Sequence, residues 1–239
     1  MLCHCGKPHQ AKSVLTRAAL IKCRYLVVDD FYTLRPSEHN MKPVLIATVI
    51  LCFSVIVGNA QPSSAKLSEQ EWQKVISALQ KEDWKEAAGL SKQYLAKLQK
   101  EESDPTLAVL RYMLLFSSAG QVANGEMTYD QLQTVLNPMV GKEVQLPFGK
   151  IVTDCRGNGA ICFPANGNFD VSVTLLNNKG THIHSFVYAN LQEKFDHASH
   201  LGEFATVRGV VDSIQLNPNR STIWIMRVFL KNGSIAIGK

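Results

Sequence analysis

The chain has 239 residues, with 25 Lys and Arg against 20 Asp and Glu, and six cysteines. Residues 1–60 hold 7 of the basic and 3 of the acidic residues, so residues 61–239 hold 18 against 17 and are close to neutral. A nearly neutral protein lacks the long-range attraction by which basic proteins bind polyphosphates, so nucleic acid is not an expected partner.

An apolar run covers residues 43–57 and follows Lys42. The small residues Gly58 and Ala60 come next, at the two positions that a signal peptidase reads. The run is shorter than the roughly 20 apolar residues that a comfortable membrane span needs. A charged start, an apolar stretch and a small-residue end are typical of a secretory signal.

This pattern predicts a signal peptide at residues 41–60 and an exported protein, periplasmic or secreted, that begins at Gln61. Translation is then expected to start at Met41, with residues 1–40 an over-extended gene prediction or a disordered extension. The alternative is an uncleaved signal, which would tether the protein to the membrane through residues 43–57.

Cys155 and Cys162 are the cysteines that remain after residue 60, and they close a short loop rich in Gly and Asn. Two cysteines at this spacing in an exported chain predict a disulfide, because oxidising compartments favour that bond. The alternative is a pair of reduced, buried thiols. A redox-active pair is not expected, since the spacing is not Cys-x-x-Cys.

Residues 61–140 have the spacing of amphipathic helices. Ser68 and Glu71 form a capping box ahead of apolar residues at helical intervals, and Thr128 with Gln131 repeats that signal. A segment between them is apolar around most of its circumference, which is typical of a helix buried between neighbours. Four helices are expected: one after Ser68, one at residues 84–98, one from Leu107 to Ala119 and one between Thr128 and Pro138.

The first two helices resemble one tetratricopeptide-type hairpin, with Trp84 and the pair Ala87 and Ala88 at its close-packing positions. One such unit cannot bury its own apolar face, and the sequence shows no clear second copy. We therefore expect a small helical cap rather than a peptide-binding solenoid.

After Gly141 the pattern changes to strands and turns, which together with the helices predicts an α+β fold. Apolar and polar residues alternate, and turns rich in Asn and Gly separate the segments. A short helix-prone stretch at residues 191–200 interrupts the series. Five strands are expected, at Lys142 to Val152 with an interruption at Pro147 and Gly149, and at Phe169 to Leu176, Thr181 to Ala189, Phe204 to Ile214 and Ser221 to Leu230.

Five strands with a helical insertion between the third and fourth form the topology of an oligonucleotide/oligosaccharide-binding (OB) barrel. The segments Gly141-Lys142-Glu143-Val144 and 202–211 resemble the strand openings of bacterial OB-fold modules, among them the tRNA-anticodon-like OB domains of exported bacterial proteins of unknown role. The resemblance covers residues 141–239. It implies an OB-type β-barrel after the helical region 61–140, and it assigns no catalytic residue.

In barrels of this class, the first inter-strand loop and the exposed sheet face are the usual recognition surface. The resemblance therefore implies ligand contacts near Arg156, Asn158 and Tyr188, with a protein, a peptide or an envelope glycan as the ligand. Basic residues are scattered along the strand half, and aromatic residues such as Phe186 and Trp224 fit a barrel core equally well. Nucleic acid is therefore not the expected ligand.

The four histidines after residue 60 fall within one stretch of the chain. His182 and His184 would share one face of a strand, and His197 and His200 one face of a short helix. Imidazole binds zinc or copper, so a periplasmic metal-binding protein is the alternative function. Ordinary surface histidines are the simpler interpretation, and under it we expect no cofactor.

Signals of hydrolytic chemistry are missing from the sequence. No Ser lies in a Gly-x-Ser-x-Gly elbow, and no pair of carboxylates is set apart from its surroundings. We therefore expect a binding or interaction protein rather than an enzyme. The sequence makes no prediction about its oligomeric state.

Overall fold

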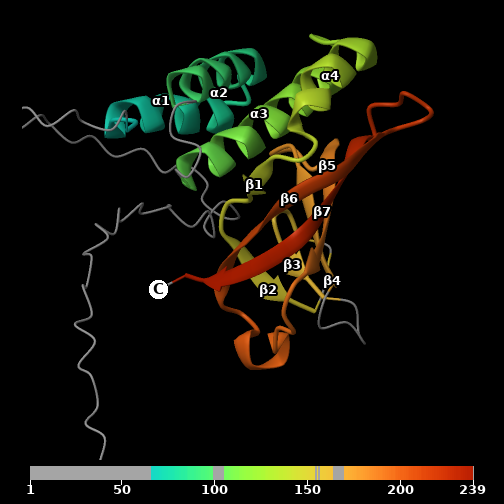
Figure 1. Cartoon of the computed structure of the whole chain (residues 1–239). Coiled ribbons are helices and arrows are strands. Elements are labelled where there is room, and N and C mark those ends of the chain that lie inside the picture. The colour runs from blue at the N-terminus through green and yellow to red at the C-terminus, as the bar shows by residue number, and fades with distance from the viewer. Residues whose placement is uncertain (1–65, 99–104, 154, 156, 164–169, 239) are drawn as a thin grey trace, which may run out of the picture. The chain divides into compact units, whose positions relative to one another are not determined.

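The computed structural model of the chain describes residues 66–98, 105–153, 155, 157–163 and 170–238 (Figure 1). Internal contacts divide residues 1–57 from residues 58–239, and every described residue belongs to the second unit. The expected extension at residues 1–40 and the expected signal at 41–60 therefore lie outside the described residues.

The described residues before position 140 form four α-helices, where the helical spacing predicts them. The first helix begins at Ser68, whose side chain accepts the backbone N–H of Glu71, while the Glu71 carboxylate accepts the backbone N–H of Ser68. The predicted capping box is thus confirmed, and Thr128 and Gln131 form the second. The elements are α1 (Glu69–Gln80), α2 (Trp84–Leu98), α3 (Pro105–Ala123), α4 (Tyr129–Leu136) and a 3-10 helix, η1 (Asn137–Met139).

Helix α3 is the centre of the helical region, as its apolar circumference predicts. Thirteen of its 19 residues are buried, because α2 packs on one side and strands β1, β5 and β7 lie on the other. Among the described helices, α3 is long and apolar enough to cross a membrane by length and composition. However, 72% of its apolar window is buried inside the protein, so packing accounts for that composition.

Seven strands form one mixed sheet in the described part of residues 143–237, which makes the fold α+β. A 3-10 helix, η2 (His197–His200), separates the fifth strand from the sixth. The strands are β1 (Glu143–Gln145), β2 (Gly149–Val152), β3 (Ile161–Cys162), β4 (Asp170–Leu176), β5 (Ile183–Leu191), β6 (Phe204–Leu216) and β7 (Trp224–Ile237).

The strand pairings return to their starting strand. The order is β1-β6-β2-β3-β4-β5-β7, and β7 also pairs with β6, which closes the circuit. The β5–β7 and β2–β3 pairs are parallel and the others antiparallel. Strands β5 and β7 therefore have a bonded neighbour on each side and no free edge, whereas β3 pairs with only Ser172 and Val173 of β4.

The predicted interruption of the first strand is confirmed, since it forms two short strands, β1 and β2, both paired with β6, whereas the sequence does not predict β3. The break falls at Pro147, which has no N–H to donate to a ladder. Gly149 starts the second piece, where a Cβ would lie 2.2 Å from the carbonyl oxygen of Gly159. Strand β3 has two residues, too few to produce the alternation that predicts a strand.

The last strand also differs from the prediction, since β7 runs to Ile237 instead of ending at Leu230. The sequence Asn232-Gly233 reads as a turn, but the chain passes through it as an irregularity of the ladder. Gly233 lies there against β5, where a Cβ would approach the carbonyl oxygen of Asn190 to 2.8 Å. The helix-prone stretch 191–200 is reduced to η2, because β5 continues to Leu191.

Two apolar cores meet at α3. One lies among the helices and includes Val75, Leu98 and Leu110. The other fills the sheet and also takes in Leu115 of α3 and Leu132 of α4. The second core therefore crosses the expected boundary at residue 140, so the helices complete the burial of the sheet.

Candidate functional site

Strands β4, β5 and β7 alternate between buried and outward side chains, as a sheet with one face on the core requires. The outward set combines aromatic rings with polar and charged groups, and we call it the outer face. It consists of Asp170, Ser172 and Thr174 on β4, Phe186, Tyr188 and Asn190 on β5, and Arg227, Phe229 and Lys231 on β7.

Strand register puts two of these rings side by side. Tyr188 is opposite Ser172 on one side and opposite Phe229 on the other. The Tyr188 and Phe229 rings are stacked with centroids 5.3 Å apart, and Tyr188 remains 36% exposed. The pair is a partly apolar platform, and because the two rings lie face to face, a ligand ring can stack on the outer face of one of them.

The neighbouring row of the outer face carries a cation. Phe186 is opposite Arg227, and the Arg227 guanidinium carbon lies 4.7 Å from the centre of the Trp224 ring. Trp224 in turn meets Phe186 edge to face at 6.3 Å. These contacts place the guanidinium over an indole ring, a position that cation–π attraction favours.

The other end of the outer face is polar. Asn190 donates a hydrogen bond of 3.1 Å to the carboxylate of Asp170 across the β4–β5 pair. Lys231 forms an ion pair of 2.8 Å with Asp212 of β6, and both side chains are about half exposed. Exposed pairs of this kind stabilise a fold little, so these groups can bond to a ligand at small cost.

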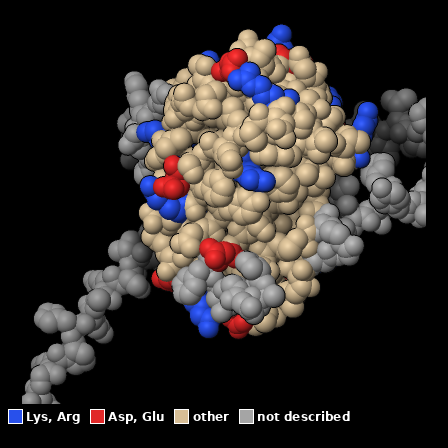
Figure 2. Space-filling model, turned by 90° about the vertical axis from the view of Figure 1, so that its right-hand side faces the viewer, with Lys and Arg blue, Asp and Glu red and all other residues tan. Residues whose placement is uncertain are grey.

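A groove of about 450 Å³ lies over the aromatic platform and the polar end. We call it the outer groove; its lining includes Asp170, Tyr188, Asp212, Phe229 and Lys231. Its described lining has two carboxylates against one amine, so it lacks the positive field that attracts a polyphosphate. Figure 2 shows one face of the molecule, on which basic side chains are scattered and form no continuous patch.

Of the three ligand contacts implied by the resemblance, Tyr188 lies in the outer groove. Asn158 does not join it: its side-chain oxygen accepts the Leu176 N–H at 2.9 Å, and its NH₂ group donates to the Leu176 carbonyl at 3.4 Å. Leu176 is four residues along β4 from Ser172, so Asn158 bonds to the strand about 13 Å from the Tyr188 row. Arg156 lies outside the described residues.

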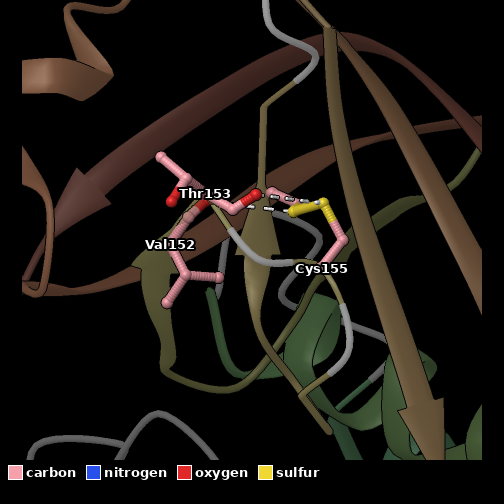
Figure 3. The surroundings of a disulfide bond; sticks show 4 residues. Val152, Thr153 and Cys155 are labelled. Atoms are coloured by element: carbon pink, nitrogen blue, oxygen red, sulfur yellow. Dashed lines mark hydrogen bonds between the residues drawn. A yellow bond between two sulfur atoms is a disulfide. The ribbon is translucent and has the colours of Figure 1, made fainter.

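The two cysteines are joined, as the sequence predicts (Figure 3). Cys155 and Cys162 form a disulfide with their Cα atoms 5.5 Å apart. The Cys162 sulfur lies 3.9 Å from the carbonyl oxygen of Val152, so the bridge packs beside β2. A disulfide is typical of proteins in oxidising compartments.

The four histidines are spread over two environments. His197 stacks on Phe163 at 4.5 Å, and His200 stacks on Phe195 at 5.3 Å and pairs with Glu203 at 3.0 Å. His182 and His184 lie at the start of β5, where His184 is buried. No group of three or more His, Cys, Asp or Glu side chains that could hold a metal occurs within the described ranges.

His184 is the most unusual of the four, because it is 1% exposed and neither ring nitrogen has a hydrogen-bond partner within the protein. Its ring packs edge to face on Trp84 at 4.6 Å and also contacts Phe116 at 4.9 Å. Burial, with a smaller effect from His182, lowers the pKa of His184 from its usual 6.5 to about 4. The imidazole is therefore neutral at pH 7 and acts as a core residue joining α2, α3 and β5.

Sequence reasoning singled out Tyr188 but missed its partners Phe229, Arg227 and Asp170. A signal for two of them was present, since Arg227, Phe229 and Lys231 stand at two-residue intervals in an otherwise apolar run. That alternation predicts which residues share a face. It does not predict that β5 and β7 are parallel neighbours, and that pairing is what brings Phe229 next to Tyr188.

No family model, curated protein or solved structure matches this chain. The comparisons therefore assign neither a family nor an activity. Fold and function have to be inferred from the chain's own residues and their arrangement.

Proposed function

We propose that this protein is an exported, non-enzymatic binding protein whose recognition surface is the outer face of an OB-type barrel. The OB-type label is supported by the order of pairing. If β1 and β2 are taken as one broken strand, four of the five pairings of such a barrel are present, including the parallel one between the third and the fifth long strands, and the short β3 lies between the first and the second. Helix η2 lies between the third and fourth, where these barrels carry a helix.

The outer groove is the observation that carries the binding role. Stacked rings flanked by carboxylate, amide and amine groups are the usual composition of a ligand site: apolar area with a few polar groups that fix orientation. A protein, a peptide or an envelope glycan is the proposed ligand class.

Export is supported by the predicted signal at residues 41–60 together with the disulfide between Cys155 and Cys162. Intact mass of the protein from its native host tests this part of the proposal. We expect a chain that starts at Gln61 and resists thiol alkylation until it is reduced. A chain that keeps residues 41–60 and alkylates without reductant would show that the compartment is wrong.

The binding role is tested by screening the protein against arrays of glycans and peptides and repeating the screen with Tyr188→Ala. We expect at least a tenfold loss of affinity for the bound ligand, because the variant removes half of the platform. Phe204→Ala is the matched control, since Phe204 is a similarly exposed ring, 40% against 36%, outside the groove. Equal losses in the two variants, or no bound ligand, would contradict the proposed site.

A further inference from the structure

Arg227 is the cation of the outer face that has no acidic partner. Its Nε is buried without a hydrogen-bond partner, and no described carboxylate forms an ion pair with its guanidinium. Lys231, the other base of the face, is already paired with Asp212. A guanidinium that already lies on an indole ring loses little further conformational entropy when it binds a ligand. Its fork of N–H groups matches the two oxygens of a carboxylate.

The charges of the outer face are separated along the strands. Arg227 lies in the row beyond the Tyr188–Phe229 pair, whereas Asp170 and Asp212 lie at the opposite, polar end. Arg227 and Lys231 are four residues apart on β7, so the face is about 13 Å long between them. A ligand that fits this surface carries an acid at one end and hydroxyl or amide groups at the other.

We propose that the outer face binds an acidic glycan in which carboxylate-bearing sugars alternate with neutral sugars; this inference rests on the proposed function. Arg227 binds the carboxylate. The apolar C–H face of the neighbouring neutral sugar packs on Tyr188, the exposed ring of the Tyr188–Phe229 pair, because C–H groups are attracted to the negative face of an aromatic ring. Asp170 accepts hydrogen bonds from the hydroxyl and amide groups of that neutral sugar, and Asn190 donates hydrogen bonds to them or accepts hydrogen bonds from them.

Other polymers fit this surface less well. A single-stranded nucleic acid needs a continuous basic groove, and the described lining of the outer groove has Asp170 and Asp212 against Lys231 alone. A peptide that binds as an added strand needs a free edge, and β5 and β7, which carry Tyr188, Arg227 and Phe229, are each paired on both sides. A glycan with a carboxylate on every sugar would place a second carboxylate next to Asp170 and Asp212, where like charges repel.

The test is calorimetric titration of the protein without residues 1–60 with defined oligosaccharides at two salt concentrations. Two ligands in which acidic and neutral sugars alternate, here called the alternating acids, are a hyaluronan tetrasaccharide and a peptidoglycan-strand tetrasaccharide with free lactyl carboxylates. Their methyl esters keep the sugars and block the carboxylates. A galacturonate tetramer supplies an acid on every sugar, an N-acetylglucosamine tetramer supplies none, and a thymidine decanucleotide represents nucleic acid.

We expect one alternating acid to bind at least tenfold more tightly than its methyl ester and than the galacturonate tetramer. Arg227→Gln should remove that preference, and Arg227→Lys should restore part of it, since Lys keeps the charge without the fork. Arg220→Gln is the matched control, because Arg220 pairs with Asp130 away from the groove. Thermal melting of each variant checks that it is folded.

Each other outcome overturns the inference in a distinguishable way. Equal affinity for acid, ester and neutral tetramer would remove the carboxylate contact and leave the proposed glycan-binding function standing. No binding of any sugar by the folded protein would reject this ligand, and the peptide arrays would then decide the proposed function. Tighter, strongly salt-dependent binding of the decanucleotide would reject both.

Discussion

Acid should destabilise this protein through one buried side chain, His184. The unfolded chain takes up a proton on this histidine near pH 6.5, whereas the folded protein does so only near pH 4. Stability from the neutral imidazole is therefore complete above pH 6.5 and is lost as the pH falls toward 4. The complete loss is about 3 kcal/mol, and about 2 kcal/mol of it falls between pH 7 and pH 5.

The pH range matters because carboxylates respond at lower pH. A hydrogen bond from Lys97, with one from Ser68, lowers the pKa of Glu71 to about 2, and a hydrogen bond from Ser199 lowers that of Asp196. Their contributions are present above the ordinary pKa of a carboxyl group and disappear below it. Measurements between pH 7 and pH 5 therefore lie above the range in which these carboxylates respond, and the His184 variants isolate the contribution of His184.

The assay is urea denaturation followed by tryptophan fluorescence at several pH values from 7 to 5. His184→Leu and His184→Phe should each flatten the pH dependence of the unfolding free energy, since neither side chain can take up a proton. At pH 7 they should cost little, because the imidazole they replace makes no hydrogen bond. If both variants lose as much stability as the wild type between pH 7 and pH 5, the explanation is wrong.

Two further predictions concern packing and the disulfide. Gly120→Ala would place a Cβ 2.3 Å from the Trp84 ring, so it should lower the unfolding free energy by about 1–3 kcal/mol in urea melts. Gly89→Ala is the control: its Cβ would have nothing within 4 Å, so it should raise the unfolding free energy by roughly 0.5–1 kcal/mol. Removing the bridge with Cys155→Ala and Cys162→Ala should lower it by about 2.5 kcal/mol, and an unchanged urea midpoint would contradict a structural role for the bridge.

Local chemistry explains what sequence reasoning placed correctly. Capping boxes at Ser68 and Thr128 depend on residues three apart, and the apolar circumference of α3 is a property of one segment. Alternation along β4 and β5 depends on the two-residue period of a strand. The disulfide between Cys155 and Cys162 likewise joins residues close in sequence. All of these signals can be read without knowing which segments become neighbours.

The candidate site depends on neighbours, and the sequence does not specify them. Tyr188 meets Phe229 because β5 and β7, distant in the chain, pair in parallel with one particular register. Arg227 becomes a fixed cation because Trp224 lies beneath it. A shift of register by one residue would turn these side chains to the opposite face, and only the packed core prevents it.

The sequence by itself determined the helical and strand halves of this protein, their caps and the cysteine bridge, because those follow from contacts within a few residues. The tertiary structure decided that Asn158 bonds to β4 and that His184 is buried against Trp84 instead of joining the other histidines. It also assembled the outer groove. Such contacts depend on long-range packing, whose free energy is shared among many residues and is not encoded in any short segment.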